Sequence, residues 1–336
     1  MTVVLPTRTP QSDPEPGICD ELRRGQVALR LIGMAVGPLR SVRAISNDGS
    51  TKRSLMLATL GDLVEDIVVH HDGPINDASD TLARITRRRG GSAATVAAMA
   101  AKLGFESRFL GQVGTDATGR KLVEELGAEG VDVSAVRRSG TTGTIVALVD
   151  PTGERTMLTD RSACLGLDQP DAAWLDDVTV LHVPLYSLSE PPISETAMTV
   201  IAWAQARGIP VSIDASSTSI IEMLAVAETR ELLAAIGPVV ILANGDEATV
   251  LGIDGPLGNT PVVVKRGPRP AVIFTVGSAP IEVPAVTLEP VRDTTGAGDA
   301  FAAGFLTYSS GLGWRANPVE ACKAGHQAAA KHLTTL

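Results

Sequence analysis

The chain has 336 residues, of which 44% are apolar, 20% are charged and 3% are aromatic. This length suffices for a large α/β domain with a substantial buried core, and 33 glycines and 21 prolines predict frequent turns. The formal net charge of −9 makes the surface acidic, and an acidic surface repels phosphate backbones and anionic lipids. Composition therefore argues against nucleic acids and membranes as partners.

The cysteines and the apolar runs bear on where the protein resides. Cys19, Cys164 and Cys322 form no CxxC pair, so the sequence offers neither a disulfide framework nor a zinc ribbon. Reduced thiols are typical of the cytoplasm, where we expect this protein. The apolar run over residues 31–39 is well short of the roughly 20 residues that a membrane-spanning helix needs. It also begins too late for a secretory signal.

The first 54 residues differ from the rest of the chain. Residues 7–17 are polar and rich in proline, a composition typical of segments that do not pack into a core. We expect residues 1–54 to form a flexible extension and residues 55–336 to form the globular domain. An alternative is that Met56 is the true initiator.

From residue 56 onward, short apolar runs alternate with helical stretches. After a first run at 56–60, strands are predicted at 178–183, 211–213, 239–242, 262–264 and 272–275, and helices at 194–206, 220–236 and 246–251. Fully apolar strands separated by helices are typical of a parallel sheet that helices cover on both faces. The sequence therefore predicts an α/β fold.

Two segments break this alternation. Residues 144–149 and 154–159 flank an Asp-Pro-Thr-Gly turn, and this pattern predicts a β-hairpin. Residues from 67 onward also have the pattern of strands and loops. We expect the segments at about 67–89 and 141–160 to form a small β-structured lid. Because its strands would have exposed edges, the lid could pair two copies of the chain into a homodimer.

The most specific motif is DTTGAGD over residues 293–299, which follows a strand-like run at 281–286 and opens a helix of small residues. Its two glycines let the backbone turn tightly and let an anion approach closely. The amides of Gly296, Ala297 and Gly298 are then expected to point at a phosphate, assisted by the helix dipole. Asp299 lies in the first helical turn, where its carboxylate can accept a proton. An anion site beside a carboxylate base suits phosphoryl transfer to a hydroxyl.

The spacing of this motif also fits a simpler structure, a glycine-rich turn followed by an ordinary helix-capping aspartate. Two nucleotide-binding fingerprints do not fit it. A dinucleotide-binding GxGxxG motif would need glycine at position 301, where the chain has Phe301, and it would belong to a first βαβ unit. The phosphate-loop pattern GxxxxGK[ST] does not occur in the sequence. Both fingerprints are therefore excluded.

A second pair of glycines precedes another helix of small residues, which runs to about residue 104. Gly90 and Gly91 would let a ligand contact backbone amides, and Thr95 could offer a hydroxyl. The alternative is that small residues serve tight packing of this helix on the sheet. The basic run at 87–89 is either a solvated face or a guide for an anionic substrate.

Polar residues follow several predicted strands directly. They are Asp62 and Asp66 after the first strand, Asn244 and Glu247 after the strand at 239–242, and Lys265 and Gly267 after the strand at 262–264. Strand ends in open α/β sheets face the ligand crevice, so the two aspartates are candidates for binding hydroxyl groups. Asn244 and Glu247 could orient water around a magnesium–phosphate group. Loop solubility is the alternative for the two aspartates. The five histidines lack the spacing of metal ligands.

Together these segments resemble the PfkB family of carbohydrate kinases, over roughly residues 56–330. The resemblance depends on two stretches, one from Gly90 through GQVGTDATG at 111–119 and the other at 293–299. It implies a ribokinase-like three-layer α/β/α sandwich with a mainly parallel central sheet and a small β-structured lid. It also implies ATP-dependent phosphorylation of a sugar-like hydroxyl, assisted by Mg²⁺, with the lid closing over the acceptor.

The resemblance also assigns roles by position. The catalytic positions are Asp299 as general base and Gly296, Ala297 and Gly298 as anion hole. The sugar-facing positions are Asp66, Gly90 and Gly91, with Asp62 beside them. Asn244 and Glu247 match the magnesium–phosphate motif, with Glu247 acting through water, and Lys265, Gly267 and His326 match positions around the nucleotide. Asp293 lies near the monovalent-cation site of some members, so K⁺ is a candidate cofactor.

One position departs from the family. Thr95 stands where the family usually has asparagine, and threonine cannot bridge two hydroxyls as an amide can. We expect a sugar kinase with a small-molecule substrate. A nucleoside kinase of the same family is the nearest alternative. A non-catalytic sugar-binding protein with the same fold is a third hypothesis, and the intact Asp299 and GAG sequence argue against it.

Overall fold

The computed structural model describes residues 55–152, 154–289, 291, 293–308 and 313–335. The extension predicted over residues 1–54 lies outside these ranges. Within them, no helix combines the length and the apolar character that a bilayer span requires.

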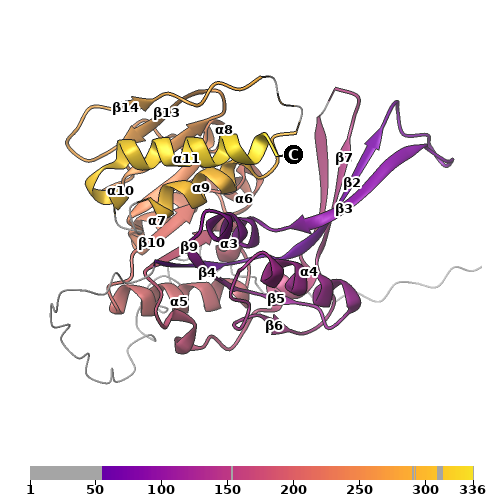
Figure 1. Cartoon of the computed structure of the whole chain (residues 1–336), viewed down its shortest axis with the longest axis horizontal. Coiled ribbons are helices and arrows are strands. Elements are labelled where there is room, and N and C mark those ends of the chain that lie inside the picture. Colours follow the sequence, from indigo (N-terminus) through magenta and orange to yellow (C-terminus); the bar gives the residue numbers. More distant parts are fainter. Residues whose placement is uncertain (1–54, 153, 290, 292, 309–312, 336) are drawn as a thin grey trace, which may run out of the picture.

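An eight-stranded, mainly parallel sheet forms the centre of the fold (Figure 1). Its strands are β1 (Met56–Leu60), β4 (Glu106–Leu110), β9 (Val180–Pro184), β10 (Val211–Asp214), β11 (Val240–Asn244), β12 (Val262–Arg266), β13 (Arg269–Phe274) and β14 (Ile281–Val283). They lie in the order β14-β13-β12-β11-β10-β9-β1-β4. Strands from β4 to β12 are parallel, and β13 and β14 add an antiparallel edge. The parallel sheet predicted from the apolar runs is confirmed.

Helices cover both faces of this sheet (Figure 1). One face carries α3 (Ser92–Lys102), α4 (Ala117–Ala128), α9 (Ala297–Thr307), α10 (Gly313–Ala316) and α11 (Pro318–Leu333). The other carries α5 (Ile193–Ala206), α6 (Thr218–Met223), α7 (Val226–Ile236) and α8 (Gly245–Val250). Short 3₁₀ helices lie at Ser162–Gly166, Ala172–Leu175 and Leu185–Leu188. These layers form the three-layer sandwich that the family resemblance implies.

Strand alternation explains why both faces are buried. Successive side chains of a strand point to opposite sides of the sheet. Leu57 therefore packs in the core beneath α3 and α9, whereas Ala58 packs in the core beneath α5. Val240 and Ile241 are divided between the same two cores. Apolar residues at consecutive positions are thus required, and they produce the continuous runs seen in the sequence.

A second sheet of four strands forms the lid, which projects from the main sheet (Figure 1). Its order is β3 (Ala83–Gly90), β2 (Val64–His71), β7 (Thr144–Val149) and β8 (Arg155–Asp160). β2 is antiparallel to β3 and parallel to β7, and β7 and β8 form the hairpin expected around the Asp-Pro-Thr-Gly turn. A further pair, β5 (Gln112–Val113) and β6 (Arg137–Arg138), lies beside the main sheet.

Two predicted elements differ from the structure. The single helix expected over 220–236 is divided into α6 and α7, because Ala225 has a φ of 64° and a left-handed residue cannot continue a right-handed helix. Alanine is the best helix former, so the sequence gives no sign of this break. The strand expected over 281–286 ends at Val283, and the next residue is Pro284, which has no amide to donate to a sheet.

The buried central strand predicts unequal effects of one substitution at two sites. Leu57→Ala should lower the free energy of unfolding by about 2–5 kcal/mol, because Leu57 is fully buried and leaves a cavity. Leu82→Ala should change it by less than about 0.5 kcal/mol, because Leu82 is 92% exposed. Urea unfolding of both variants measures the difference, and equal losses would contradict this account of the core.

Candidate active site

Asp299 lies in the first turn of α9, where it meets the first residue of α3. Its Oδ1 accepts a hydrogen bond of 2.7 Å from Ser92 Oγ. α3 and α9 pack against each other, and alanine accounts for most of the side chains that α3 buries. Small side chains allow close helix packing, so the beginnings of two helices come together here. Gly296 precedes α9 with a φ of 76°, the left-handed turn expected from the GAG sequence.

Burial raises the pKa of Asp299 to about 7. The Ser92 hydrogen bond opposes this rise, and the nearby Asp214 carboxylate adds to it. The positive charges of Lys265 and Arg89 act to lower the pKa. A carboxyl group with a pKa near 7 changes its protonation state in the working range of a general base.

A lysine ammonium lies beside the predicted anion hole. Lys265 Nζ is 3.5 Å from the position that a Cβ at Gly298 would occupy. The same nitrogen forms a 2.7 Å ion pair with Asp214 Oδ2, across the intervening strand β11. Burial acts to lower the pKa of Lys265, but the Asp214 and Glu247 carboxylates outweigh it and raise the pKa. Lys265 therefore keeps its charge. Of the three amides predicted to form the anion hole, that of Ala297 already donates a hydrogen bond of 3.2 Å to the Thr294 carbonyl.

Asp214 was not predicted from the sequence. It is the last residue of β10, and its position at a strand end was the available signal, the same one that drew attention to Asn244. Asp214, Asn244 and Lys265 end or nearly end three neighbouring parallel strands, so they form a polar row along the carboxyl edge of the sheet.

Asn244 and Glu247 form a capping box at the start of α8. Both Glu247 carboxylate oxygens accept hydrogen bonds from Asn244, Oε2 from the backbone amide at 2.7 Å and Oε1 from Nδ2 at 2.6 Å. Glu247 is 3% exposed, and burial together with the Asp214 charge raises its pKa. A divalent cation nearby would favour the ionised form. The fixed carboxylate therefore suits Mg²⁺ held through water.

Asp66 lies at the base of the lid, above two glycines whose lack of a side chain is required. A Cβ at Gly90 would lie 2.2 Å from Asp66 Oδ1, and a Cβ at Gly91 would lie 2.1 Å from the Asp62 carbonyl oxygen. Gly91 also has a φ of 100°. Burial raises the pKa of Asp66, against the charges of Arg88 and Arg89. The structure thus brings Asp66 together with this turn.

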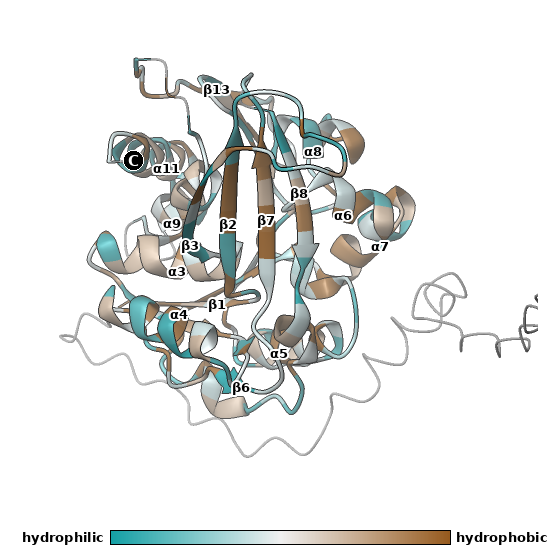
Figure 2. Ribbon diagram, turned by 90° about the vertical axis from the view of Figure 1, so that its right-hand side faces the viewer, coloured by the Kyte–Doolittle hydropathy of each residue, from teal (hydrophilic) through white to brown (hydrophobic). Residues whose placement is uncertain are grey.

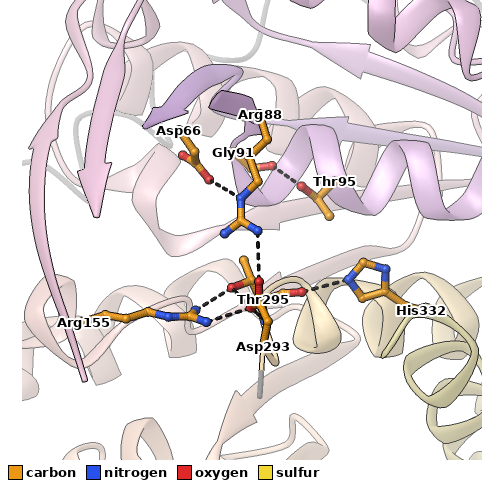
Figure 3. Close-up of polar contacts among 8 residues, drawn as sticks. All are labelled: Asp66, Arg88, Gly91, Thr95, Arg155, Asp293, Thr295 and His332. Atoms are coloured by element: carbon orange, nitrogen blue, oxygen red, sulfur yellow. Dashed lines mark hydrogen bonds and ion pairs between the residues drawn. The ribbon is translucent and has the colours of Figure 1, made fainter. Parts of the chain in front are cut away.

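Two residues that were predicted to contact the substrate, Asp62 and Thr95, instead bind other groups of the protein. The Asp62 carboxylate forms a bidentate ion pair with Arg161, at 2.7 and 2.9 Å, and both side chains are largely buried. Thr95 Oγ1 donates to the Gly91 carbonyl at 2.9 Å (Figure 3). Arg161 was not singled out from the sequence. Asp62 and Thr95 therefore shape the walls and the turn around Asp66, and their polar atoms already have partners.

Two predicted nucleotide contacts lie away from this cluster. His326 is buried in α11 with its ring 5.2 Å from Phe301, edge to face, and its Nε2 is 3.3 Å from the Val283 carbonyl oxygen. These neighbours enclose the ring, so the geometry does not favour its proposed contact with adenine. Gly267 has a φ of 60° in the exposed turn between β12 and β13, which explains the glycine there.

Asp293 joins the lid to the start of the motif (Figure 3). Its Oδ1 accepts hydrogen bonds from Arg155 Nη2 at 2.7 Å, from the Thr295 amide at 2.9 Å and from Thr295 Oγ1 at 2.6 Å. Its Oδ2 accepts one from Arg88 Nη1 at 3.3 Å. Burial acts to raise the pKa of Asp293, but the Thr295 hydrogen bonds and Arg155 outweigh it and hold the pKa far below the usual range. Two guanidinium groups on this carboxylate do not favour the predicted K⁺ contact.

His332 on α11 supports the same turn from the other side (Figure 3). Its Nε2 lies 2.8 Å from the Thr295 carbonyl oxygen, and because a carbonyl accepts, the ring nitrogen donates. A Cβ at Gly296 would lie 2.9 Å from this nitrogen, so glycine also makes room for the imidazole. His332 has no motif around it in the sequence, and this contact could not be predicted.

Comparisons with known proteins identify the family of this chain. Residues 54–335 match the pfkB family carbohydrate kinases. A fructokinase of Klebsiella pneumoniae is 30% identical over 261 residues, which cover 74% of this chain and 82% of that protein. The adenosine kinase structure from Sinorhizobium meliloti has a TM-score of 0.71 at 23% identity, over 84% of this chain and 94% of the other.

A further solved structure, described as an E. coli ribokinase II in complex with ATP and Mg²⁺, has a TM-score of 0.70 at 20% identity. It covers 84% of this chain and 93% of the other. At this identity the likeness shows the fold alone. The match over most of the chain and the fructokinase relative go further: the chain belongs to the pfkB family of carbohydrate kinases, phosphotransferases with an alcohol group as acceptor.

Proposed function

We propose that the protein is an ATP-dependent sugar kinase in which Asp299 is the general base. The observation that carries this proposal is the half-buried Asp299 carboxylate, held by Ser92 between the glycine turn at Gly91 and the GAG turn. One turn belongs to the acceptor side, next to Asp66, and the other belongs to the phosphate side, next to Lys265. A base between the two is placed for transfer from one to the other.

The reaction follows from these positions. The acceptor hydroxyl oxygen forms a bond to the γ-phosphorus, and the bond between this phosphorus and the β–γ bridging oxygen breaks, so ADP leaves. The hydroxyl proton passes to the Asp299 oxygen that Ser92 does not hold. The Gly296 and Gly298 amides and the Lys265 ammonium stabilise negative charge on the transferring group, whereas the Ala297 amide already donates to the Thr294 carbonyl. Asp66 and the Gly90–Gly91 turn bind other hydroxyls of the acceptor.

The metal and nucleotide positions are part of the proposal. Glu247 and Asn244 would hold Mg²⁺ through water, and Mg²⁺ when bound neutralises phosphate charge. Lys265 and Gly267 lie on the β12–β13 edge, where we place the nucleotide. The ATP and Mg²⁺ complex of the structural neighbour supports this choice of phosphoryl donor. Cys164 and Cys322 are free and buried, which supports the reducing cytoplasm as the location.

We also propose that a second copy of the chain covers the outer face of the lid. Strand register places six apolar side chains on this face: Ile67, Val69, Ile85, Val146, Leu148 and Leu158. Ile85 and Leu158 are 59% and 56% exposed, and apolar segments of β2, β7 and β8 are visible in Figure 2. Partly and largely exposed apolar side chains that gather on one face mark an interaction site. A second lid, equally apolar, matches it in a twofold pair.

Removal of the base should abolish most turnover. We expect Asp299→Asn to lower kcat by at least roughly 10²–10⁴-fold, because the amide cannot accept the proton. ADP release should be measured with Mg-ATP across pentoses, hexoses, ketoses, sugar acids and nucleosides. The last class tests the alternative of a nucleoside kinase. Turnover close to that of the wild type in Asp299→Asn would remove Asp299 from the mechanism.

The acid limb of the pH profile of kcat/KM should report the pKa of Asp299 and the effect of Ser92 on that pKa. Since the ionised base is the active form and its pKa is about 7, kcat/KM should fall about tenfold per pH unit below pH 7. The Ser92 hydrogen bond favours the ionised form, so Ser92→Ala should raise the pKa and move this limb to higher pH. Ser92→Thr keeps a hydroxyl and is the control. A limb that stays in place in Ser92→Ala would contradict the assignment.

The outer lid face should determine the oligomeric state. A charge at an apolar interface is costly, so Leu158→Glu should shift the protein from dimer to monomer in sedimentation velocity. Val276→Glu adds the same charge at an apolar residue that is 54% exposed and outside the lid, and it should leave the dimer intact. A wild-type monomer at micromolar concentration would exclude this dimer.

A further inference from the structure

The inner face of the lid is basic, although the chain as a whole is acidic. Strand register places Asp66, Arg88 and Arg84 on one face, together with Arg155 at the far edge. The ion pairs of Arg88 and Arg155 with Asp293 confirm that this face looks toward the site. Three arginines against one aspartate give the lid's inner face a net positive charge, part of which Asp293 offsets. Such a surface attracts anions into the space that it covers.

Arg88 lies beside Asp66, which is one of the proposed acceptor contacts (Figure 3). Its Nε lies 3.8 Å from Asp66 Oδ2, and its Nη1 lies 3.3 Å from Asp293 Oδ2. Asp66 lies over Gly90, two residues before Ser92, which holds the base. An acceptor that reaches Asp299 with one hydroxyl and Asp66 with another must therefore pass beside the Arg88 guanidinium.

Most of the hydrogen-bonding capacity of Arg88 is unused within the part of the chain that the structure describes. A guanidinium has five N–H donors in a planar fork. Among the described residues, Arg88 makes one side-chain hydrogen bond, the long one to Asp293, and its distance to Asp66 exceeds hydrogen-bond range. Asp293 already accepts three donors from Arg155 and Thr295, so it does not depend on Arg88. The fork is thus available to another partner.

We propose that the acceptor is an anionic sugar, whose carboxylate or phosphate group is bound by Arg88. This inference rests on the proposed kinase function and specifies its substrate class. A planar guanidinium matches both oxyanions with paired hydrogen bonds, which a neutral hydroxyl cannot provide. Arg155 lies on the same face and adds positive charge from the other edge of the lid. The basic run at 87–89 thus has two functions, since Arg87 points to the outer face and pairs with Glu65.

Matched acceptor pairs test this proposal. ADP release should be measured for D-fructose against D-fructose 6-phosphate, D-ribose against D-ribose 5-phosphate and D-glucose against D-gluconate. We expect kcat/KM of at least one anionic acceptor to exceed that of its neutral partner by roughly 10- to 100-fold, the scale of a hydrogen bond between charged groups. The phosphate pairs and the gluconate pair distinguish the two kinds of anion.

Two variants assign the preference to Arg88. Arg88→Met should lower the ratio of anionic to neutral kcat/KM by the same factor, whereas Arg87→Met removes a charge from the adjacent position on the outer face and should leave the ratio unchanged. If Arg88→Met lowers turnover of both acceptors equally, Arg88 acts only through its contact between the lid and Asp293, and the inference fails. Turnover of neutral acceptors without any anionic preference overturns it and leaves the kinase function standing. ADP release with no acceptor at all would instead contradict the kinase function itself.

Discussion

The hydrogen bond between Ser92 and Asp299 is the contact on which the proposed site depends. The two residues are 207 positions apart in sequence, and they meet because α3 buries mostly alanine where larger side chains would separate it from α9. Packing of the two helices around this contact removes the carboxylate from water, which raises its pKa toward the range of a base, while the hydrogen bond itself favours the ionised form. Packing of small residues and tuning of the base are therefore one feature of the fold rather than two.

The parallel sheet determines what surrounds this base. Because β10, β11 and β12 run in the same direction, their polar ends meet at one edge, and the Asp214–Lys265 ion pair can cross over β11. This pair keeps the lysine charged beside the GAG turn, and Asp214 at the same time adds to the raised pKa of Asp299. On the side of the site that faces Asp66, the lid adds Arg88 and Arg155. An overall acidic chain thus concentrates its positive charge where phosphate and acceptor are proposed to meet.

Local sequence patterns predicted the elements and the turns, whereas long-range partners were out of reach. The apolar runs indicated the parallel sheet because residues buried on both faces must be apolar at every position. The GAG and Gly90–Gly91 turns were visible because glycine there is required by φ or by close contacts. Arg161, His332 and Ser92 were missed, since each acts on a residue distant in sequence. His326 and Asp293 were chosen by their position in the family pattern. That position gave no sign that Phe301 and Val283 enclose the His326 ring, or that two arginines bind the Asp293 carboxylate.

The central claim is that the phosphoryl group passes to an acceptor hydroxyl, and ³¹P NMR of the complete reaction tests it most directly. The enzyme is incubated with Mg-ATP and each acceptor class in turn, and the products are identified by their resonances. ADP and a phosphate ester of the acceptor should appear together in equal amounts, and neither should form when the acceptor is omitted. ADP accompanied by inorganic phosphate alone, at the same rate with and without acceptor, would contradict it.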